Sequence, residues 1–225
     1  MPSNLRKTRF ALINPNTSQE TTRAMVEIAT CAAPAMDIVG FTASSGPGLI
    51  SNADELAAAG EAVSRLDPQM FEGFSGAIVS AFGDPGLESL RDALDIPVLG
   101  IAEQGMARAT RNHGRFSVVT TTPDLVHSIR SRAESYGFGA QLASVRLTEG
   151  ELHETMADPE LLLTRLRKAI ARAIEEDKAE AIVIGGGPLA RAASVLANEV
   201  TVPLIEPVPA AVLGLAAVLG YEPTI

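Results

Sequence analysis

The chain has 225 residues and a formal net charge of −9; 46% of its residues are hydrophobic and 20% are charged. This length allows one large α/β domain or two small ones with a substantial core, and the composition is that of a folded soluble protein. Because acidic residues outnumber Lys and Arg, no positive excess is present to neutralise phosphates, and nucleic acid is excluded as a partner. Small anions are not excluded, since local dipoles hold them.

Cysteine and histidine are too sparse for a disulfide framework or a metal site. The single Cys31 excludes an internal disulfide, and His113, His127 and His153 lack ligand spacing, so no metal is predicted. Residues 1–9 lead directly into a strand pattern instead of an apolar signal core, and the apolar run 207–219 is too short to span a bilayer. We therefore expect a cytoplasmic protein without a membrane partner, and a buried or subunit-facing helix over 207–219 in a homo-oligomer.

Short β-branched runs alternate with longer helical patterns along the whole chain. The expected elements, in chain order, are strand 10–13, helix 19–32, strand 37–41, helix 53–66, strand 76–80, helix 87–94, strand 97–101, helix 103–112, strand 116–120, helix 125–136, strand 142–147, helix 159–176, strand 181–184, helix 189–198, strand 203–205 and helix 210–219. Near-continuous apolar strands between helices indicate parallel sheet covered on both faces. Loop 42–52 is rich in small residues, and both a mobile flap over a site and an ordinary surface loop are consistent with it.

Three strand-like segments return in the second half of the chain, in the same order and at nearly constant spacing. Residues 9–17 are echoed by 115–123, 77–83 by 182–188, and 96–99 by 202–205. This duplication predicts two pseudosymmetric, doubly wound α/β lobes, with the ligand site in the crevice between them. The expected boundaries are 1–108 for the first lobe and 109–215 for the second, with 207–225 packing back across the first.

In doubly wound sheets, ligands lie at the carboxyl ends of the strands, where loops meet helix N-termini. Backbone N–H groups and helix dipoles at such ends bind carboxylates and similar anions. The predicted ligand-binding residues are those at four such strand ends: Asn14, Pro15, Asn16, Ser80, Ala81, Phe82, Gly83, Thr120, Thr121, Gly186, Gly187 and Pro188. Thr17, Ser18 and Thr122 also suit plain helix capping.

No nucleotide fingerprint accompanies these loops. Gly185, Gly186 and Gly187 are not followed by the third glycine of a dinucleotide site, and no P-loop motif occurs. Asp84 is a candidate acid or base, although Asp-Pro-Gly is also ordinary turn chemistry. Thr121 is the other candidate for a catalytic group.

These segments together resemble the aspartate/glutamate/hydantoin racemase superfamily, and most closely its hydantoin and allantoin racemase branch. The resemblance covers nearly the whole chain and rests on segments 13–18 (INPNTS), 82–87 (FGDPGL), 96–103 (IPVLGIAE), 119–121 (VTT) and 202–205 (VPLI). It implies two pseudosymmetric lobes and cofactor-independent chemistry at an acidic carbon. In that chemistry one cysteine from each lobe faces the substrate carbon, one removing a proton and the other delivering one to the opposite face.

The sequence departs from the family's pattern at both of these positions. The cysteine that precedes Phe-Gly-Asp-Pro-Gly-Leu in the family is replaced by Ala81, and the second-lobe cysteine is replaced by Gly186. Neither residue has a titratable group, so thiol-based two-base racemisation is expected to be absent.

Three hypotheses follow from this departure. The first is a divergent, isomerase-like enzyme that acts without a cofactor on a small carboxylate or cyclic ureide and uses Asp84, Thr120, Thr121, Ser80 or a bound water. A lyase, decarboxylase or hydrolase built on the same cradle is a variant of it. The second is a non-catalytic protein that binds small anions. The third is that one or both of positions 81 and 186 were altered deliberately to trap a substrate complex.

Overall fold

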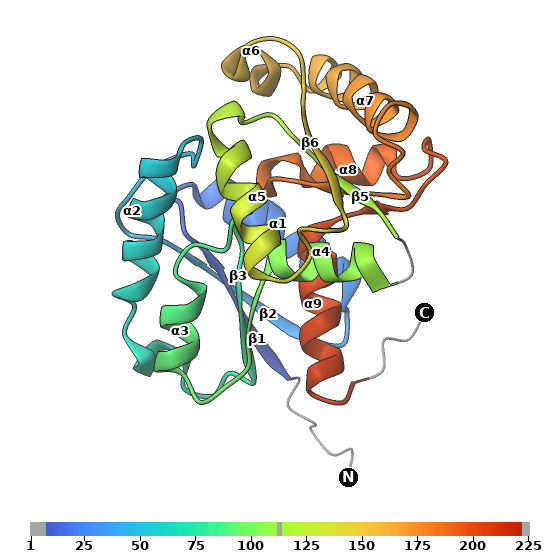
Figure 1. Cartoon of the computed structure of the whole chain (residues 1–225). Helices are drawn as coiled ribbons and strands as arrows, with labels where there is room; N and C mark the ends of the chain where they lie inside the picture. The colour runs from blue at the N-terminus through green and yellow to red at the C-terminus, as the bar shows by residue number, and fades with distance from the viewer. Residues whose placement is uncertain (1–7, 112–113, 222–225) are drawn as a thin grey trace.

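A computed structural model describes residues 8–111 and 114–221 and contains eight strands in that part of the chain (Figure 1). The strands are β1 (Arg9–Asn14), β2 (Asp37–Thr42), β3 (Gly76–Val79), β4 (Val98–Gly100), β5 (Phe116–Thr120), β6 (Leu142–Leu147), β7 (Ala181–Ile184) and β8 (Leu204–Ile205). The α-helices are α1 (Gln19–Ala32), α2 (Ala53–Ser64), α3 (Leu87–Ala93), α4 (Ile101–Arg111), α5 (Val126–Ser135), α6 (Leu152–Ala157), α7 (Pro159–Glu175), α8 (Ala190–Leu196) and α9 (Pro207–Val218). Short 3-10 helices cover Pro68–Phe71, Pro123–Leu125 and Gly187–Leu189.

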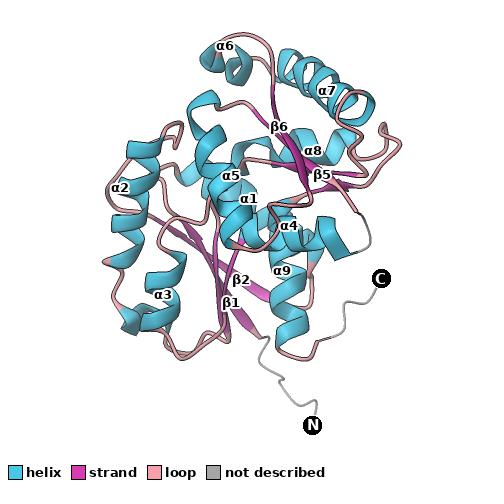
Figure 2. Ribbon diagram, in the orientation of Figure 1, coloured by secondary structure: helices cyan, strands magenta, loops and turns pink. Residues whose placement is uncertain are grey.

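The strands form two four-stranded parallel sheets with equivalent strand orders, β2-β1-β3-β4 and β6-β5-β7-β8 (Figure 2). We call β1–β4 with their helices the first lobe and β5–β8 with theirs the second lobe. In both sheets the first strand lies between the second and the third, so β1 corresponds to β5 and β3 to β7. The predicted fold class of two parallel-sheet α/β lobes is confirmed.

Helix α9 packs on the first lobe although it ends the described chain. It contacts α4, α1, β3 and β4, and Figure 1 shows it in red beside α4, below the second sheet. Its side chains Val208, Val212 and Leu215 are buried in one cluster with Phe10 and Ile78 of β1 and β3. A helix that is apolar over most of its surface needs such cover on several sides. The lobe boundary at 108 and 109 stays a prediction, and α4 spans it.

Most element bounds agree with the sequence patterns within a few residues, and three differences have physical reasons. Helix α6 was not predicted, because Gly150 and the short polar stretch around it are typical of a loop. Helix α4 begins at Ile101, inside the strand expected over 97–101, because the Asp84 carboxylate caps its first N–H groups. Helix α9 begins at Pro207 instead of 210, a position where proline fits the first turn. The predicted helix end at Asn112 lies outside the described residues.

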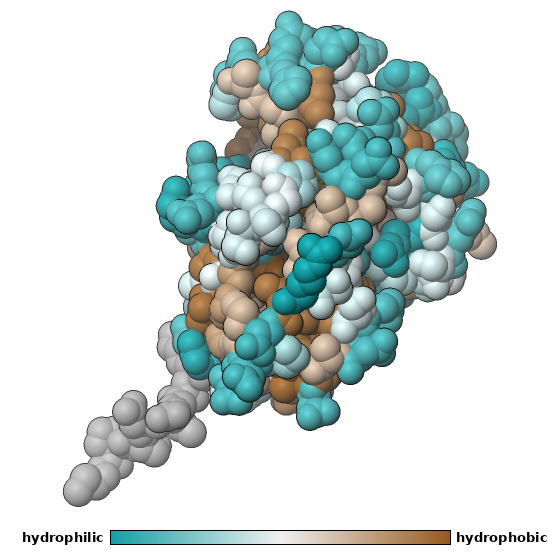
Figure 3. Space-filling view, turned by 90° about the vertical axis from the view of Figure 1, so that its left-hand side faces the viewer, coloured by the Kyte–Doolittle hydropathy of each residue, from teal (hydrophilic) through white to brown (hydrophobic). Residues whose placement is uncertain are grey.

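The outer surface of the first lobe mixes polar and apolar residues, as is usual on a solvent-facing side. Figure 3 shows this on the side of α2 and α3. Within residues 8–111 and 114–221, no helix has the length and apolar character needed to cross a membrane.

Candidate functional site

A pocket lies between the lobes at the carboxyl ends of both sheets. The first lobe contributes Asn16 after β1 and Ser80, Ala81 and Phe82 after β3; the second contributes Thr121 after β5. The loop after β7 adds a further wall: Gly185, Gly186, Gly187 and Pro188. The pocket has about 630 Å³ of empty space, a volume that includes the solvent at its open mouth.

Four of the twelve predicted ligand-binding residues are not among those that line this pocket, namely Asn14, Pro15, Gly83 and Thr120. Asn14 lies directly behind Asn16, and Pro15 faces a separate small pocket beside Phe41. The Thr120 hydroxyl donates to the carbonyl of Gly185 at 2.8 Å, which ties the end of β5 to the loop after β7. These residues shape the loops behind the pocket wall.

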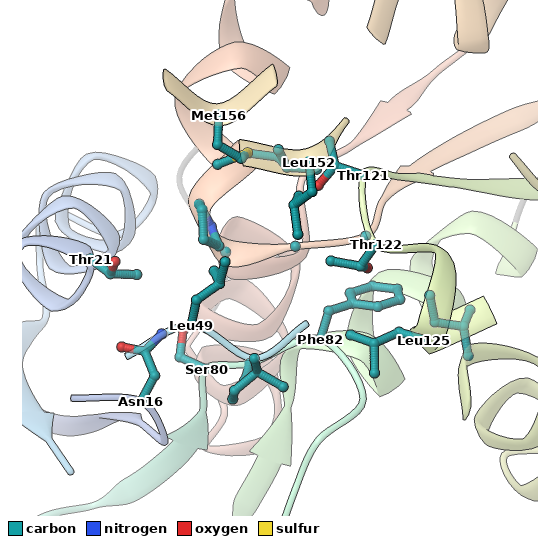
Figure 4. Close-up of a pocket in the computed structure, with 18 residues that line it drawn as sticks. Asn16, Thr21, Leu49, Ser80, Phe82, Thr121, Thr122, Leu125, Leu152 and Met156 are labelled. Carbon is teal, nitrogen blue, oxygen red and sulfur yellow. The ribbon is translucent and has the colours of Figure 1, made fainter. Parts of the chain in front are cut away.

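Asn14 sets the orientation of the Asn16 amide. The oxygen of Asn16, Oδ1, accepts hydrogen bonds from Asn14 Nδ2 at 2.8 Å and from the Ser18 N–H at 2.9 Å. Asn14 is fully buried, and its amide is fixed further by the Ser18 carbonyl and the Thr22 hydroxyl, both at 3.0 Å. With its oxygen engaged, Asn16 turns its amide nitrogen toward the pocket (Figure 4). A hydrogen-bond donor therefore faces the ligand space.

Further donors come from the loop backbones. Within the described residues, the N–H groups of Ala81, Phe82 and Gly187 donate no hydrogen bond to another backbone group or a side chain. The Thr121 hydroxyl also lacks a partner within that part of the chain, whereas Ser80 donates to Met25 Sδ at 3.0 Å. Such donors around a pocket suit a carboxylate, an imide or another oxygen that carries negative charge.

The positions of Ala81 and Gly186 both face the pocket, and position 186 has room for a side chain. A Cβ placed on Gly186 meets only Leu189, at 3.4 Å, which is ordinary contact. A Cβ on Gly185 comes within 2.7 Å of Val118, and one on Gly187 within 2.9 Å of Met25 Sδ. Of the three consecutive glycines, Gly186 is thus the one that a larger residue can replace without displacing a neighbour.

Apolar side chains missed by the sequence analysis cover the pocket. Leu49 and Ile50 come from the loop considered as a flap, and Leu152 and Met156 come from α6 (Figure 4). The i, i+4 spacing of Leu152 and Met156 was the available signal for one apolar helix face. Thr21, Thr122, Leu125, Ile129 and Leu189 also line the pocket without having been predicted as ligand-binding residues.

Asp84 does not line this pocket. Its carboxylate is fully buried and accepts hydrogen bonds from the N–H groups of Ala102 at 2.9 Å and Glu103 at 2.8 Å, and from the Tyr136 hydroxyl at 2.8 Å. Burial raises the pKa of Asp84 to about 6, against the opposing effect of these donors. Burial, together with the neighbouring Asp84 charge, raises the pKa of Tyr136 well above its usual value. At neutral pH the ionised Asp84 is therefore an N-terminal cap of α4.

Among residues 8–111 and 114–221, no ionisable side chain lines the ligand space. The 18 described residues that line the pocket include no Asp, Glu, His, Cys, Tyr, Lys or Arg. Cys31, His127 and His153 are exposed and lie elsewhere, while His113 is outside the described residues. The pocket offers amide, hydroxyl and backbone donors together with an apolar wall.

Comparisons with known proteins agree with this architecture. The family model described as Asp/Glu/Hydantoin racemase matches residues 11–214. A hydantoin racemase from Pseudomonas sp. (strain NS671) is 34% identical over 206 residues, covering 91% of this chain and 83% of that protein. The structure of an allantoin racemase from Klebsiella pneumoniae superposes with a TM-score of 0.88 at 32% identity, covering 96% of this chain and 90% of the other. An allantoin racemase from Pseudomonas fluorescens has a TM-score of 0.85 at 30% identity, with 96% and 94% covered.

Proposed function

Because the chain belongs to the Asp/Glu/hydantoin racemase family, we propose that its pocket binds a cyclic ureide or small carboxylate and promotes isomerisation at its acidic carbon. We further propose that it does so without a cofactor and without a pair of thiols. The observation that carries this proposal is the pocket between the two sheets, which presents unpaired donors but no ionisable side chain.

In this mechanism the donors stabilise charge and water moves the proton. The Asn16 amide and the free N–H groups of Ala81, Phe82 and Gly187 bind the oxygens of the ureide or carboxylate, including the carbonyl oxygen beside the acidic carbon. A water or hydroxide ion removes the proton, the C–H electron pair becomes an enolate, and a second water returns a proton to either face. Each well-placed donor contributes about 3 kcal/mol of transition-state stabilisation in enzymes that use such donors.

The apolar wall indicates the substituent on the ligand. Leu49, Ile50, Leu152 and Met156 form a surface on which a benzyl or isobutyl group is buried. Burial of each CH₂ group favours binding by about 0.8 kcal/mol. A cyclic ureide with a large apolar substituent is therefore expected to bind more tightly than one with a polar substituent.

A second candidate function is non-catalytic ligand binding, and the pocket without an ionisable side chain favours it. Such a protein keeps the donor cradle as a sensor or regulatory module. Both functions predict ligand binding, and only the first predicts proton exchange.

Exchange of the acidic proton in deuterium oxide distinguishes the two functions. The substrate is L-5-benzylhydantoin; proton NMR follows the exchange of its acidic proton, and chiral chromatography follows its racemisation. Calorimetry measures binding. A malonate is tested in parallel for loss of CO₂. We expect exchange above the protein-free rate, a further increase with buffer base, and a loss in Asn16→Ala. The matched control is Cys31→Ala, whose exposed thiol lies outside the pocket and whose loss leaves exchange unchanged. Binding without exchange establishes the second function, and absence of binding to every probe overturns both.

The two positions matched to family cysteines have a separate test. The double variant Ala81→Cys/Gly186→Cys is expected to gain two-base racemisation, since position 186 has room for a side chain. A folded double variant that binds the hydantoin but does not racemise it refutes this expectation and means that the pocket has diverged beyond these two residues.

Cytoplasmic location and self-association complete the proposal. Self-association is supported by the exposed apolar side chain of Val218 at the end of α9. Fractionation of the source cells and light scattering of the purified protein test them.

A further inference from the structure

We propose that Tyr136 and Arg132 of the second lobe are positioning residues that hold first-lobe loop 80–86 in the shape that presents Ala81 and Phe82 to the ligand. The inference rests on the proposed function, since it concerns the donors of the same pocket. It assigns to the contact between the lobes a role in binding as well as in folding.

Loop 80–86 has an unfavourable backbone conformation. Gly83, Asp84 and Gly86 have φ values of +111°, +49° and +75°. Asp84 carries a side chain in the left-handed region, which costs about 1 kcal/mol or more for residues other than glycine. The loop's own turn bonds are those from Asp84 N–H to Ala81 O and from Leu87 N–H to Asp84 O. A conformation of this kind persists where surrounding groups hold it.

Two of the surrounding groups come from the second lobe, in addition to the Ala102 and Glu103 N–H groups of α4 that also bond to Asp84. Arg132 Nε donates to the carbonyl of Gly83 at 2.8 Å, and the Tyr136 hydroxyl donates to Asp84 Oδ2 at 2.8 Å. Arg132 and Tyr136 are four positions apart, so they leave the same face at the C-terminal end of α5, and the guanidinium lies 5.9 Å from the Tyr136 ring. Figure 1 shows α5 at the boundary between the two lobes. Both hydrogen bonds therefore cross from one lobe to the other.

The same loop forms a wall of the pocket one to three residues earlier. Ser80, Ala81 and Phe82 line the pocket, and Phe82 also packs in a hydrophobic cluster with Phe116 and Val118 of β5. The loop is thus held on one side by α5 and presents its unpaired N–H groups on the other. A change in the Gly83 and Asp84 contacts is transmitted to Ala81 and Phe82 through one to three peptide units.

The test compares two tyrosine variants that each lose one hydroxyl. Tyr136→Phe removes the bond to Asp84, and Tyr221→Phe, the control, removes a bond to Thr8 away from the pocket. Binding of L-5-benzylhydantoin is measured by calorimetry, and hydrogen–deuterium exchange is measured for the peptide that covers residues 80–86. Tyr136→Phe is expected to weaken binding about three- to tenfold and to speed exchange in the loop, as loss of a hydrogen bond to a charged group implies. Tyr221→Phe is expected to change neither.

Arginine variants provide a rescue and a second route to refutation. Arg132→Lys keeps a donor near the Gly83 carbonyl and is expected to retain most of the affinity, whereas Arg132→Leu loses it. Wild-type affinity and exchange in both Tyr136→Phe and Arg132→Leu overturn the inference. If the wild type binds no hydantoin, the proposed function fails separately, and the positioning role is then decided by loop exchange alone.

Discussion

Replacement of Gly100 by alanine tests the account of Asp84 directly. Gly100 ends β4, and a Cβ at this position comes within 2.2 Å of Asp84 Cγ and 2.4 Å of Oδ2. Neither distance is compatible with the present carboxylate position, so the added methyl group must displace Asp84. The displaced carboxylate loses its bonds to Ala102, Glu103 and Tyr136 inside the protein.

The expected cost is large for a single methyl group. Removing the partners of a buried charge costs about 3–5 kcal/mol, and the entropic benefit of replacing glycine with alanine offsets only about 0.4–1 kcal/mol of it. Gly100→Ala is therefore expected to lose about 3 kcal/mol of unfolding free energy, which urea denaturation followed by circular dichroism measures. The matched control is Gly186→Ala, whose Cβ meets only Leu189 at ordinary contact distance. This control is expected to stay within about 1 kcal/mol of the wild type.

A double-mutant cycle identifies the cause of the loss. Asp84→Gly removes the carboxylate and suits the left-handed backbone at that position. In the Asp84→Gly background, Gly100→Ala is expected to cost about 1 kcal/mol or less, because the added methyl group no longer meets a side chain. Equal costs of Gly100→Ala in both backgrounds, or a loss below about 1 kcal/mol in the wild type, refute the assigned clash.

Three further predictions follow from the same contacts. Burial raises the pKa of the Asp84 carboxyl group to about 6 in the folded protein, so at pH values between about 4 and 6 the folded state holds a proton that the unfolded state releases. The stability that this proton contributes is fully present below about pH 4 and is lost as the pH rises through 6. This contribution to the unfolding free energy is about 3 kcal/mol in full. Denaturation measured from pH 4 to 7 is expected to show that the difference in stability between the wild type and Asp84→Asn changes with pH. A difference between the two proteins that does not depend on pH contradicts the prediction. Asn14→Ala frees the Asn16 amide to rotate and is expected to weaken hydantoin binding about tenfold, as measured by calorimetry. An unchanged affinity contradicts this role of Asn14. Met156→Ala is expected to weaken binding of 5-benzylhydantoin about tenfold but to affect 5-methylhydantoin little, and equal losses for both ligands contradict an apolar contact with the substituent.

The duplicated strand pattern was sufficient to predict the two sheets. Alternation of apolar strands and helices is a local signal, and the repetition of segments 9–17 and 115–123 relates the halves to each other. The same signal located the four loops that meet at the pocket, since parallel strands end at one edge. Eight of the twelve predicted ligand-binding residues accordingly line it.

The remaining features depend on contacts between distant parts of the chain. Asp84 follows a predicted strand end, but its carboxylate turns toward α4 and Tyr136 instead of the pocket, and no local pattern encodes that choice. The apolar cover from Leu49 and Leu152 was also missed, because one residue lies in a loop and the other in a six-residue helix. Short segments of this kind have weak periodicity and acquire their place by packing.

Pseudosymmetry has different consequences for binding and for catalysis in this protein. Strand ends related by the duplication bring backbone donors to the pocket from both lobes, and this property of the fold does not depend on side chains. Proton transfer by the protein does depend on side chains, and Ala81 and Gly186, which the resemblance leads us to match to family cysteines, have none that ionises. Under this interpretation the donors are present without ionisable groups beside them, so that charge stabilisation and proton transfer are separable. Comparison of exchange rates between the wild type and the double cysteine variant therefore measures how much of the rate enhancement the donors supply alone.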